Sequence, residues 1–176
     1  MRKVVLFIAM SLDGYIADSN GGVGWLNGQG NDNENLDTYS EFAKDIDTVL
    51  MGWNTYHQVV TELSPTEWIY GEFITYVITH NKSNSNEQIL FTDENPIDLV
   101  KNLKKQNGKD IWVCGGANLA QQLMCADLID RYYISVIPTL LGKGIPLFGE
   151  FSKEQKLSLL QTRNYNGIVE LLYEHR

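Results

Sequence analysis

The sequence has 176 residues and is 43% hydrophobic, which is enough for a sizeable core. It holds 14 Lys and Arg against 22 Asp and Glu, a formal net charge of −8 that argues against nucleic-acid partners. No apolar stretch is long enough for a membrane span, and Cys114 and Cys125 match neither a zinc spacing nor a secreted disulfide framework, so we expect a cytoplasmic protein without a metal site.

In chain order, the N-terminal part predicts a strand over Lys3–Ala9, a long polar loop over 20–35, a helix over Asp37–Ile46 and a second strand over Asp47–Gly52. The first run is apolar and rich in β-branched residues, as buried central strands are. Long polar loops of this kind often carry function. Either Asn35 or Asp37 is a suitable cap for the helix.

The alternation continues with further strands and helices. Strands are predicted over Phe73–Thr79, Glu87–Thr92, Asp110–Cys114 and Asp130–Leu141. Helices are predicted over Trp53–Val60, Asn95–Gln106 and Ala117–Ala126. Two last strands joined at Asn166–Gly167 predict a hairpin. This order is typical of an α/β domain with a mostly parallel sheet, helices on both faces and an antiparallel C-terminal hairpin. No linker divides the chain, so we expect one domain over residues 1–176.

Two strand–helix junctions carry glycine: Gly115–Gly116 and Gly52. A helix N-terminus offers unpaired N–H groups and a partial positive charge, and glycine lets a ligand approach the backbone. Gly115–Gly116 therefore predicts either a site for a pyrophosphate or nicotinamide, or merely a tight turn. In the same way, Thr55 either binds a phosphate or caps its helix. The pattern is not the G-x-G-x-x-G of Rossmann folds.

The remaining polar residues give no recognisable catalytic set. His57 and His175 are expected on the surface, whereas His80 directly follows a predicted strand. The sequence shows neither a Ser–His–Asp or Cys–His pairing nor a cluster of metal ligands. Most acids between residues 32 and 47 are expected on a solvated face, although one of them could be a functional carboxylate.

Six stretches occur in an order that resembles the dihydrofolate reductase-like superfamily: SLDGYIA, VGWL, DTVLMGWNTY, YVITH, IWVCGGANLAQQL and LLGKGIPLF. The similarity is greatest to the reductase domain of the bifunctional riboflavin-biosynthesis deaminase–reductase and its free-standing bacterial relatives. It runs from about Lys3 to Phe148, and the deaminase half is missing. The resemblance implies a three-layer αβα fold, a homodimer, and an NADPH-dependent reductase.

The resemblance also implies a set of cofactor-binding residues: Ala9, Ile16, Gly52, Trp53, Asn54, Thr55, Thr79, His80, Gly115, Gly116, Ala117, Asn118 and Leu119. The glycine pair and the residues after it would meet the cofactor and its pyrophosphate, and the turn from Gly52 to Thr55 would bind phosphates from the other side. Thr79 and His80 would flank the adenosine, and Ala9 and Ile16 would hold the nicotinamide.

Two positions depart from the pattern, because many relatives have arginine where this chain has Trp53 and His80. An Arg fork is hard to replace at a phosphate. Three alternatives follow: weaker NADPH binding, use of NADH, or loss of activity. Lys82 is a candidate to replace the positive charge of the missing arginines.

The substrate side is less defined. Dihydrofolate reductases hold the pterin with one carboxylate on the first helix, and counting back from Met51–Gly52 points to Asp37 as the catalytic candidate, whereas counting forward from Trp25 reaches Gly30. A pyrimidine-like substrate is favoured over a folate. The leading hypothesis is hydride transfer from the cofactor to a small heterocycle or ribosylamine. The alternatives are a dihydrofolate reductase and a degenerate nucleotide-binding protein without turnover.

Overall fold

The computed structural model describes residues 1–81, 83–151 and 153–176, with the backbone but not the side chain of residue 32. In these residues eight strands form one sheet, in the order β5-β4-β3-β6-β1-β7-β10-β9, and β2 pairs with β8 in a second sheet. The strands are β1 (Val4–Ser11), β2 (Tyr15–Ala17), β3 (Ile46–Gly52), β4 (Ile74–Ile78), β5 (Ile89–Thr92), β6 (Asp110–Gly115), β7 (Arg131–Ile137), β8 (Ile145–Pro146), β9 (Leu157–Tyr165) and β10 (Ile168–His175). The six strands from β5 to β7 are parallel, and β10 is antiparallel to β7 and β9. The predicted mostly parallel sheet with an antiparallel C-terminal hairpin is confirmed.

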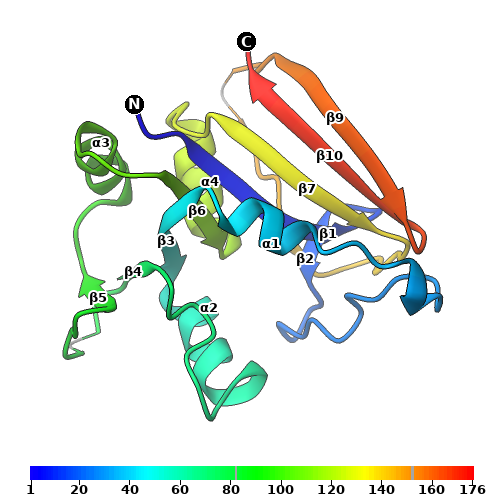
Figure 1. The fold of residues 1–176 in the computed structure, drawn as a ribbon, viewed down its shortest axis with the longest axis horizontal. Coiled ribbons are helices and arrows are strands. Elements are labelled where there is room, and N and C mark those ends of the chain that lie inside the picture. The colour runs from blue at the N-terminus through cyan, green and yellow to red at the C-terminus, as the bar shows by residue number, and fades with distance from the viewer. Residues whose placement is uncertain (82, 152) are drawn as a thin grey trace.

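Helices cover both faces of the large sheet (Figure 1). They are α1 (Thr38–Ala43), α2 (Trp53–Gln58), α3 (Pro96–Lys105) and α4 (Ala117–Cys125), with a 3-10 turn η1 (Asp32–Glu34) and a π-helical continuation of α2, η2 (Val59–Leu63). The described part of the chain contains no helix of the length and apolar character that crossing a membrane requires.

One core layer lies between the sheet and the pair α3 and α4. Leu99 and Leu103 of α3 and Leu123 of α4 pack there against sheet residues such as Leu6 and Val113, which have no exposed surface. Because the other face of the sheet is covered as well, the central strands β1, β3 and β6 are apolar almost throughout, as the sequence predicted.

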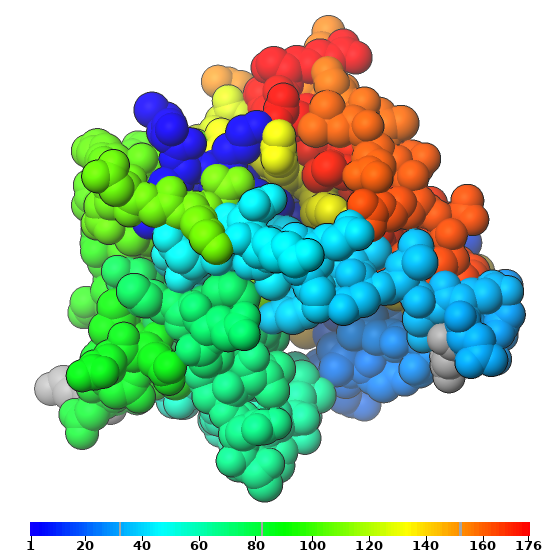
Figure 2. All heavy atoms as spheres, in the orientation of Figure 1, coloured from blue at the N-terminus to red at the C-terminus, as the bar shows by residue number. Residues whose placement is uncertain are grey.

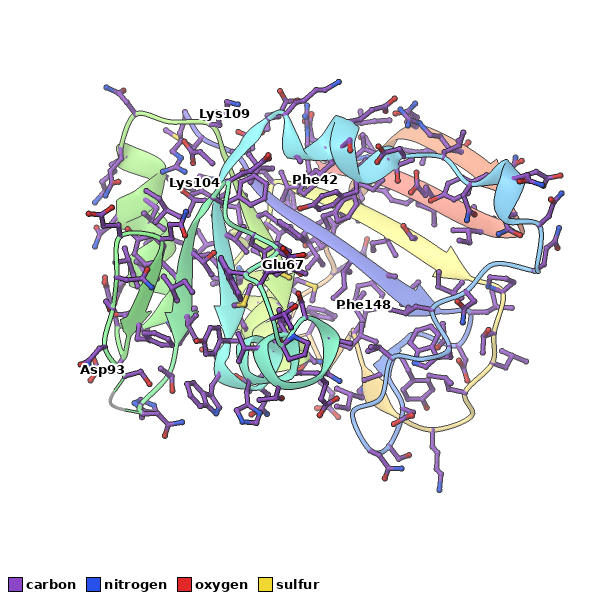
Figure 3. All side chains as sticks on the ribbon, turned by 60° about the horizontal axis from the view of Figure 1, so that its bottom comes forward. Phe42, Glu67, Asp93, Lys104, Lys109 and Phe148 are labelled. Carbon is purple, nitrogen blue, oxygen red and sulfur yellow. The ribbon has the colours of Figure 1, made fainter. Side chains whose placement is uncertain are left out.

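The opposite core layer is aromatic and lies under α1 and α2. Phe42 of α1 stacks on Phe7 of β1 with ring centroids 4.1 Å apart (Figure 3 labels Phe42). Trp112 of β6 meets both rings edge-on and donates its indole N–H to the Phe7 carbonyl at 3.0 Å. The short α1 is therefore fixed across the middle of the sheet.

The long loop before α1 is anchored by the C-terminal hairpin. Asn166 and Gly167 both have positive φ, 45° and 75°, which confirms the predicted two-residue turn. The Asn166 carbonyl accepts the Gln29 N–H, and its side-chain oxygen accepts the Asn31 N–H, both at 2.9 Å. The hairpin thus holds the segment that leads into α1, and this segment and α1 cover the centre of the face in Figure 2.

Candidate active site

Two glycine turns lie side by side at the carboxyl edge of the sheet. Strands β3 and β6 are parallel neighbours, with Met51 opposite Gly115, so both strands end at the same edge. A Cβ added to Gly52 would lie 3.9 Å from the Gly116 nitrogen. This edge is where ligands of parallel α/β sheets bind.

The Gly115–Gly116 turn is open toward α2. Its peptide bond is cis, and only Gly115 has a positive φ, at 135°, whereas φ of Gly116 is −81°. A Cβ on Gly116 would lie 3.4 Å from Thr55 Oγ1, and one on Gly115 would lie 3.8 Å from the same oxygen. The Thr55 hydroxyl and the glycine backbone therefore enclose one small space.

Two helices begin at this space without a side-chain cap. Gly52 and Gly116 are the cap residues of α2 and α4, and neither helix has a side-chain cap hydrogen bond. Thr55 therefore does not cap α2, which removes one of its two predicted roles. The first N–H groups of an uncapped helix bind anions well, so the backbone of Ala117, Asn118 and Leu119 suits a pyrophosphate.

The other predicted cofactor residues come from several elements. Ala9 lies on β1 and Ile16 on β2, where Ile16 packs against the core. Asn54 and Asn118 are exposed, whereas the side chain of Leu119 belongs to the core, so only its backbone can meet a ligand.

The two departures from the expected arginines have different surroundings. Trp53 packs with Tyr56, His57 and Phe91, with ring centroids 5.6 to 6.4 Å apart. After β4, Thr79 is buried and accepts the Asn81 N–H at 3.0 Å, while His80 is exposed. Lys82, the expected compensating cation, lies outside the described residues.

Cys114 directly precedes the glycine pair and faces the aromatic layer. Its Sγ lies 3.8 Å from the Tyr70 hydroxyl. Burial raises the pKa of the Cys114 thiol to about 11 and also raises the pKa of Tyr70. Both groups are therefore neutral at physiological pH.

Asp37 caps α1 and is exposed. Its carboxylate accepts the Ser40 N–H at 3.0 Å, and hydrogen bonds from Ser40 lower the pKa of Asp37. The predicted helix cap is thus confirmed, while the catalytic role stays a prediction to which the structure adds no contact with the glycine turns.

Sequence reasoning missed a buried acid, Glu170 on β10, which is 2% exposed. Four hydroxyl groups surround its carboxylate, those of Thr38, Tyr133, Ser135 and Tyr165. The available signal was an acid inside the apolar run of a predicted strand.

Two observations concern other kinds of site. A cavity of about 460 Å³ lies at the opposite edge of the sheet, near the start of β3 and β4, where Arg2, Thr48 and Phe73 line it. It therefore lies at the amino ends of β3 and β4, whereas the glycine turns lie at the carboxyl ends of β3 and β6. Within the described residues, His, Cys, Asp and Glu side chains do not gather in groups of three or more that could hold a metal ion.

The structure defines an α/β protein with two adjacent glycine turns at the carboxyl edge of its sheet. The chain belongs to the RibD C-terminal domain family, which it matches over residues 2–169. It is 39% identical over 175 residues to the uncharacterized protein YwjB of Bacillus subtilis, covering 98% of this chain and 97% of that one.

Solved structures share the same fold. A protein named for riboflavin biosynthesis from Shewanella sp. PV-4 has a TM-score of 0.85 and 26% identity, with 99% of both chains covered. A deaminase/5-amino-6-(5-phosphoribosylamino)uracil reductase of Thermotoga maritima has a TM-score of 0.72 and 16% identity, covering 99% of this chain and 57% of that one. Dihydrofolate reductase from Enterococcus faecalis, solved with NADP(H), has a TM-score of 0.64 and 17% identity, covering 99% and 96%. The expected dihydrofolate reductase-like fold is confirmed.

Proposed function

We propose that this chain is an NADPH-dependent reductase, active as one domain over residues 1–176, which transfers hydride to a small heterocycle or ribosylamine. The reaction would resemble that of 5-amino-6-(5-phosphoribosylamino)uracil reductase, an activity named for the Thermotoga relative. The observation that carries the proposal is the pairing of the two glycine turns, with Thr55 Oγ1 3.4 Å from the Cβ position of Gly116.

The residues at the carboxyl edge fit a dinucleotide. Gly52 and Gly116 leave room for a ligand against the backbone, and a side chain at Gly116 would fill the space beside Thr55. The uncapped starts of α2 and α4 supply N–H donors for phosphate oxygens, and the Thr55 hydroxyl adds another donor. The bound nicotinamide cofactor would supply the hydride.

The protein's part in catalysis is orientation and exclusion of water. Ala9 lies on β1 and Cys114 on β6, two neighbouring parallel strands, and both residues follow the paired stretch toward the carboxyl ends of the strands. The aromatic layer of Phe7, Phe42 and Trp112 forms a rigid apolar floor beside them. A flat heterocycle suits an apolar position beside this layer, whose own rings pack on one another.

One observation favours a second candidate, a nucleotide-binding protein without turnover. Trp53 stands where many relatives have arginine, and its ring packs on Tyr56 and Phe91 rather than offering a cation to phosphate. Binding of NADPH or NADH without oxidation of either, whatever heterocycle is offered, would be the behaviour of this candidate.

We further propose a cytoplasmic homodimer. Both cysteines are free thiols, which suits a reducing compartment. The edge strand β9 exposes Leu159 by 54% and Leu160 by 48%, and unpaired apolar edges are suited to self-association. Light scattering at micromolar concentrations should give twice the chain mass, and a monomer mass throughout would contradict the dimer.

Titration of nicotinamide fluorescence tests the main proposal. We expect NADPH to bind more tightly than NADH, though weakly because the arginines are replaced. Oxidation of bound NADPH in the presence of aminopyrimidine ribosylamines, followed by absorbance, then tests the reaction. If neither nucleotide binds at millimolar concentration, the reductase proposal is wrong.

A further inference from the structure

Glu170 is a buried carboxylate that the proposed cofactor site does not use. Oε1 accepts hydrogen bonds from Thr38 at 2.7 Å, Tyr165 at 2.8 Å and Ser135 at 3.4 Å, and Oε2 accepts one from Tyr133 at 3.1 Å. Among the described residues, Lys, Arg and His side chains make no ion pair with it.

Structural stability is a poor reason for this arrangement. Burying a charge costs free energy, and hydroxyl donors offset that cost without reversing it. The nearest cation across the strand pair, Arg163, forms its ion pair with Glu41 at 2.6 Å instead. An apolar residue would pack more favourably beneath α1, so the carboxylate calls for a role in binding.

Its place in the sheet connects it to the predicted nicotinamide position. Ala9 is opposite Ser135 in the β1–β7 ladder, and Ser135 is opposite Glu170 in the β7–β10 ladder. Residues opposite each other in a ladder project from the same face, and neighbouring strands lie about 4.8 Å apart. Glu170 therefore lies about 10 Å from Ala9 on the same face, roughly the reach of a planar bicyclic ring or a substituted single ring.

Ser135 lies between Ala9 and Glu170 in this row. Ser135 is partly exposed, and its bond to Glu170 is the longest of the four at 3.4 Å. Among the described residues, Oε2 accepts a bond from Tyr133 alone, so it can accept another. Burial, together with the charge of Glu170, raises the pKa of Tyr133 to about 12, which keeps Tyr133 a donor.

We propose that Glu170 and Ser135 bind the N–H-bearing edge of the substrate, a planar nitrogen heterocycle with amino or amidine donors. The placement of that ring rests on the proposed function, which puts the nicotinamide at Ala9. In this proposal the substrate-binding carboxylate comes from the last strand, β10, and not from the candidate Asp37. Helix α1 contributes only the Thr38 hydroxyl, and Asp37 caps that helix.

Calorimetry with 2,4-diaminopyrimidine as the probe tests the proposal, with unsubstituted pyrimidine as the ligand that lacks N–H donors. Wild type should bind the diamine and not pyrimidine. Glu170→Gln should bind it about tenfold more weakly or worse, because the bonds to the charged acceptor are lost. The matched control is Glu174→Gln on the same strand, whose carboxylate pairs with Lys3 and Arg131 near the other end and whose change should leave affinity within about twofold.

Equal affinity of wild type and Glu170→Gln overturns the proposal, and so does absence of diaminopyrimidine binding by wild type at millimolar concentration. If Glu170→Gln does not fold, the Ser135→Ala variant tests the proposal instead. Several-fold weaker binding of the diamine by Ser135→Ala supports the proposal, and unchanged binding contradicts it. NADPH titration of the same samples separates the two proposals. If Glu170→Gln binds both NADPH and the diamine like wild type, only the proposal of a Glu170 site is wrong. If wild type binds the diamine but not NADPH, only the reductase proposal is wrong.

Discussion

Replacing Gly116 by alanine tests whether the glycine pair serves a cofactor or only the turn. The φ of Gly116, −81°, suits any residue, and an added Cβ would make an ordinary contact with Thr55 Oγ1 at 3.4 Å. We therefore expect the free energy of unfolding to change by less than about 1 kcal/mol. The same Cβ would fill the space between Thr55 and the start of α4, so NADPH affinity should fall at least tenfold, about 1.4 kcal/mol.

Gly115→Ala is the matched variant, with the opposite balance. Its added Cβ would have only ordinary contacts, with Thr55 Oγ1 at 3.8 Å and Ile8 Cδ1 at 3.9 Å, so crowding is not the cost. The cost lies in φ, which at 135° is a backbone conformation that residues with a Cβ rarely adopt. We expect a loss of about 1–3 kcal/mol in unfolding free energy, which a domain of typical stability, about 5–15 kcal/mol, survives.

Urea denaturation and nicotinamide fluorescence, measured on the same preparations, separate the two effects. The expected pattern is a near-normal denaturation midpoint with weak NADPH binding for Gly116→Ala, and a lowered midpoint for Gly115→Ala. A Gly116→Ala protein that unfolds earlier yet binds NADPH like wild type would show that the glycines serve the turn alone.

Three further predictions follow from single contacts. Thr55→Val should weaken NADPH several-fold in fluorescence titration while changing unfolding free energy by less than about 0.5 kcal/mol, and unchanged affinity would refute its role. The pKa of Asp37 is lowered from 3.8, so its cap should stabilise the protein fully well above pH 3.8 and progressively less as pH falls below it; the difference in urea midpoint from Asp37→Asn should vanish in acid. Iodoacetamide at pH 8 should label exposed Cys125 first, because Cys114 has a pKa near 11; equal rates would contradict this.

The strands of the large sheet could be predicted along the chain because the signals are local. An apolar run covered on both faces, as in β1 and β3, is distinct from a helical pattern. The cap at Asp37 and the turn at Asn166–Gly167 follow from side-chain chemistry within three residues. The two glycine turns could be placed at one edge for the same reason, since parallel strands end together.

Side-chain surroundings set by distant parts of the chain could not be predicted. The sequence predicts Thr55 either as a phosphate ligand or as a cap. Gly52 occupies the cap position, and only the structure shows that the Thr55 hydroxyl lies beside the glycine pair. Trp53 stands where the resemblance predicts an arginine, and its packing on Phe91 depends on β5 lying beyond β4 in the sheet. Cofactor binding by all these residues stays a prediction.

Glu170 shows the limit most clearly, because its strand reverses the usual alternation. Val169 is 40% exposed and Glu170 is 2% exposed, so the acid faces inward and the apolar residue outward. The donors that make this possible come from Thr38, 132 residues away, and from Ser135, 35 residues away. A buried carboxylate is tolerated only where several such donors converge, and a single sequence does not show convergence. Once the sheet order is known, an acid at an inward strand position opposite a hydroxyl residue is therefore a useful signal of a site. In this chain, the row from Ala9 through Ser135 to Glu170 gives that signal, and we assign it to the substrate.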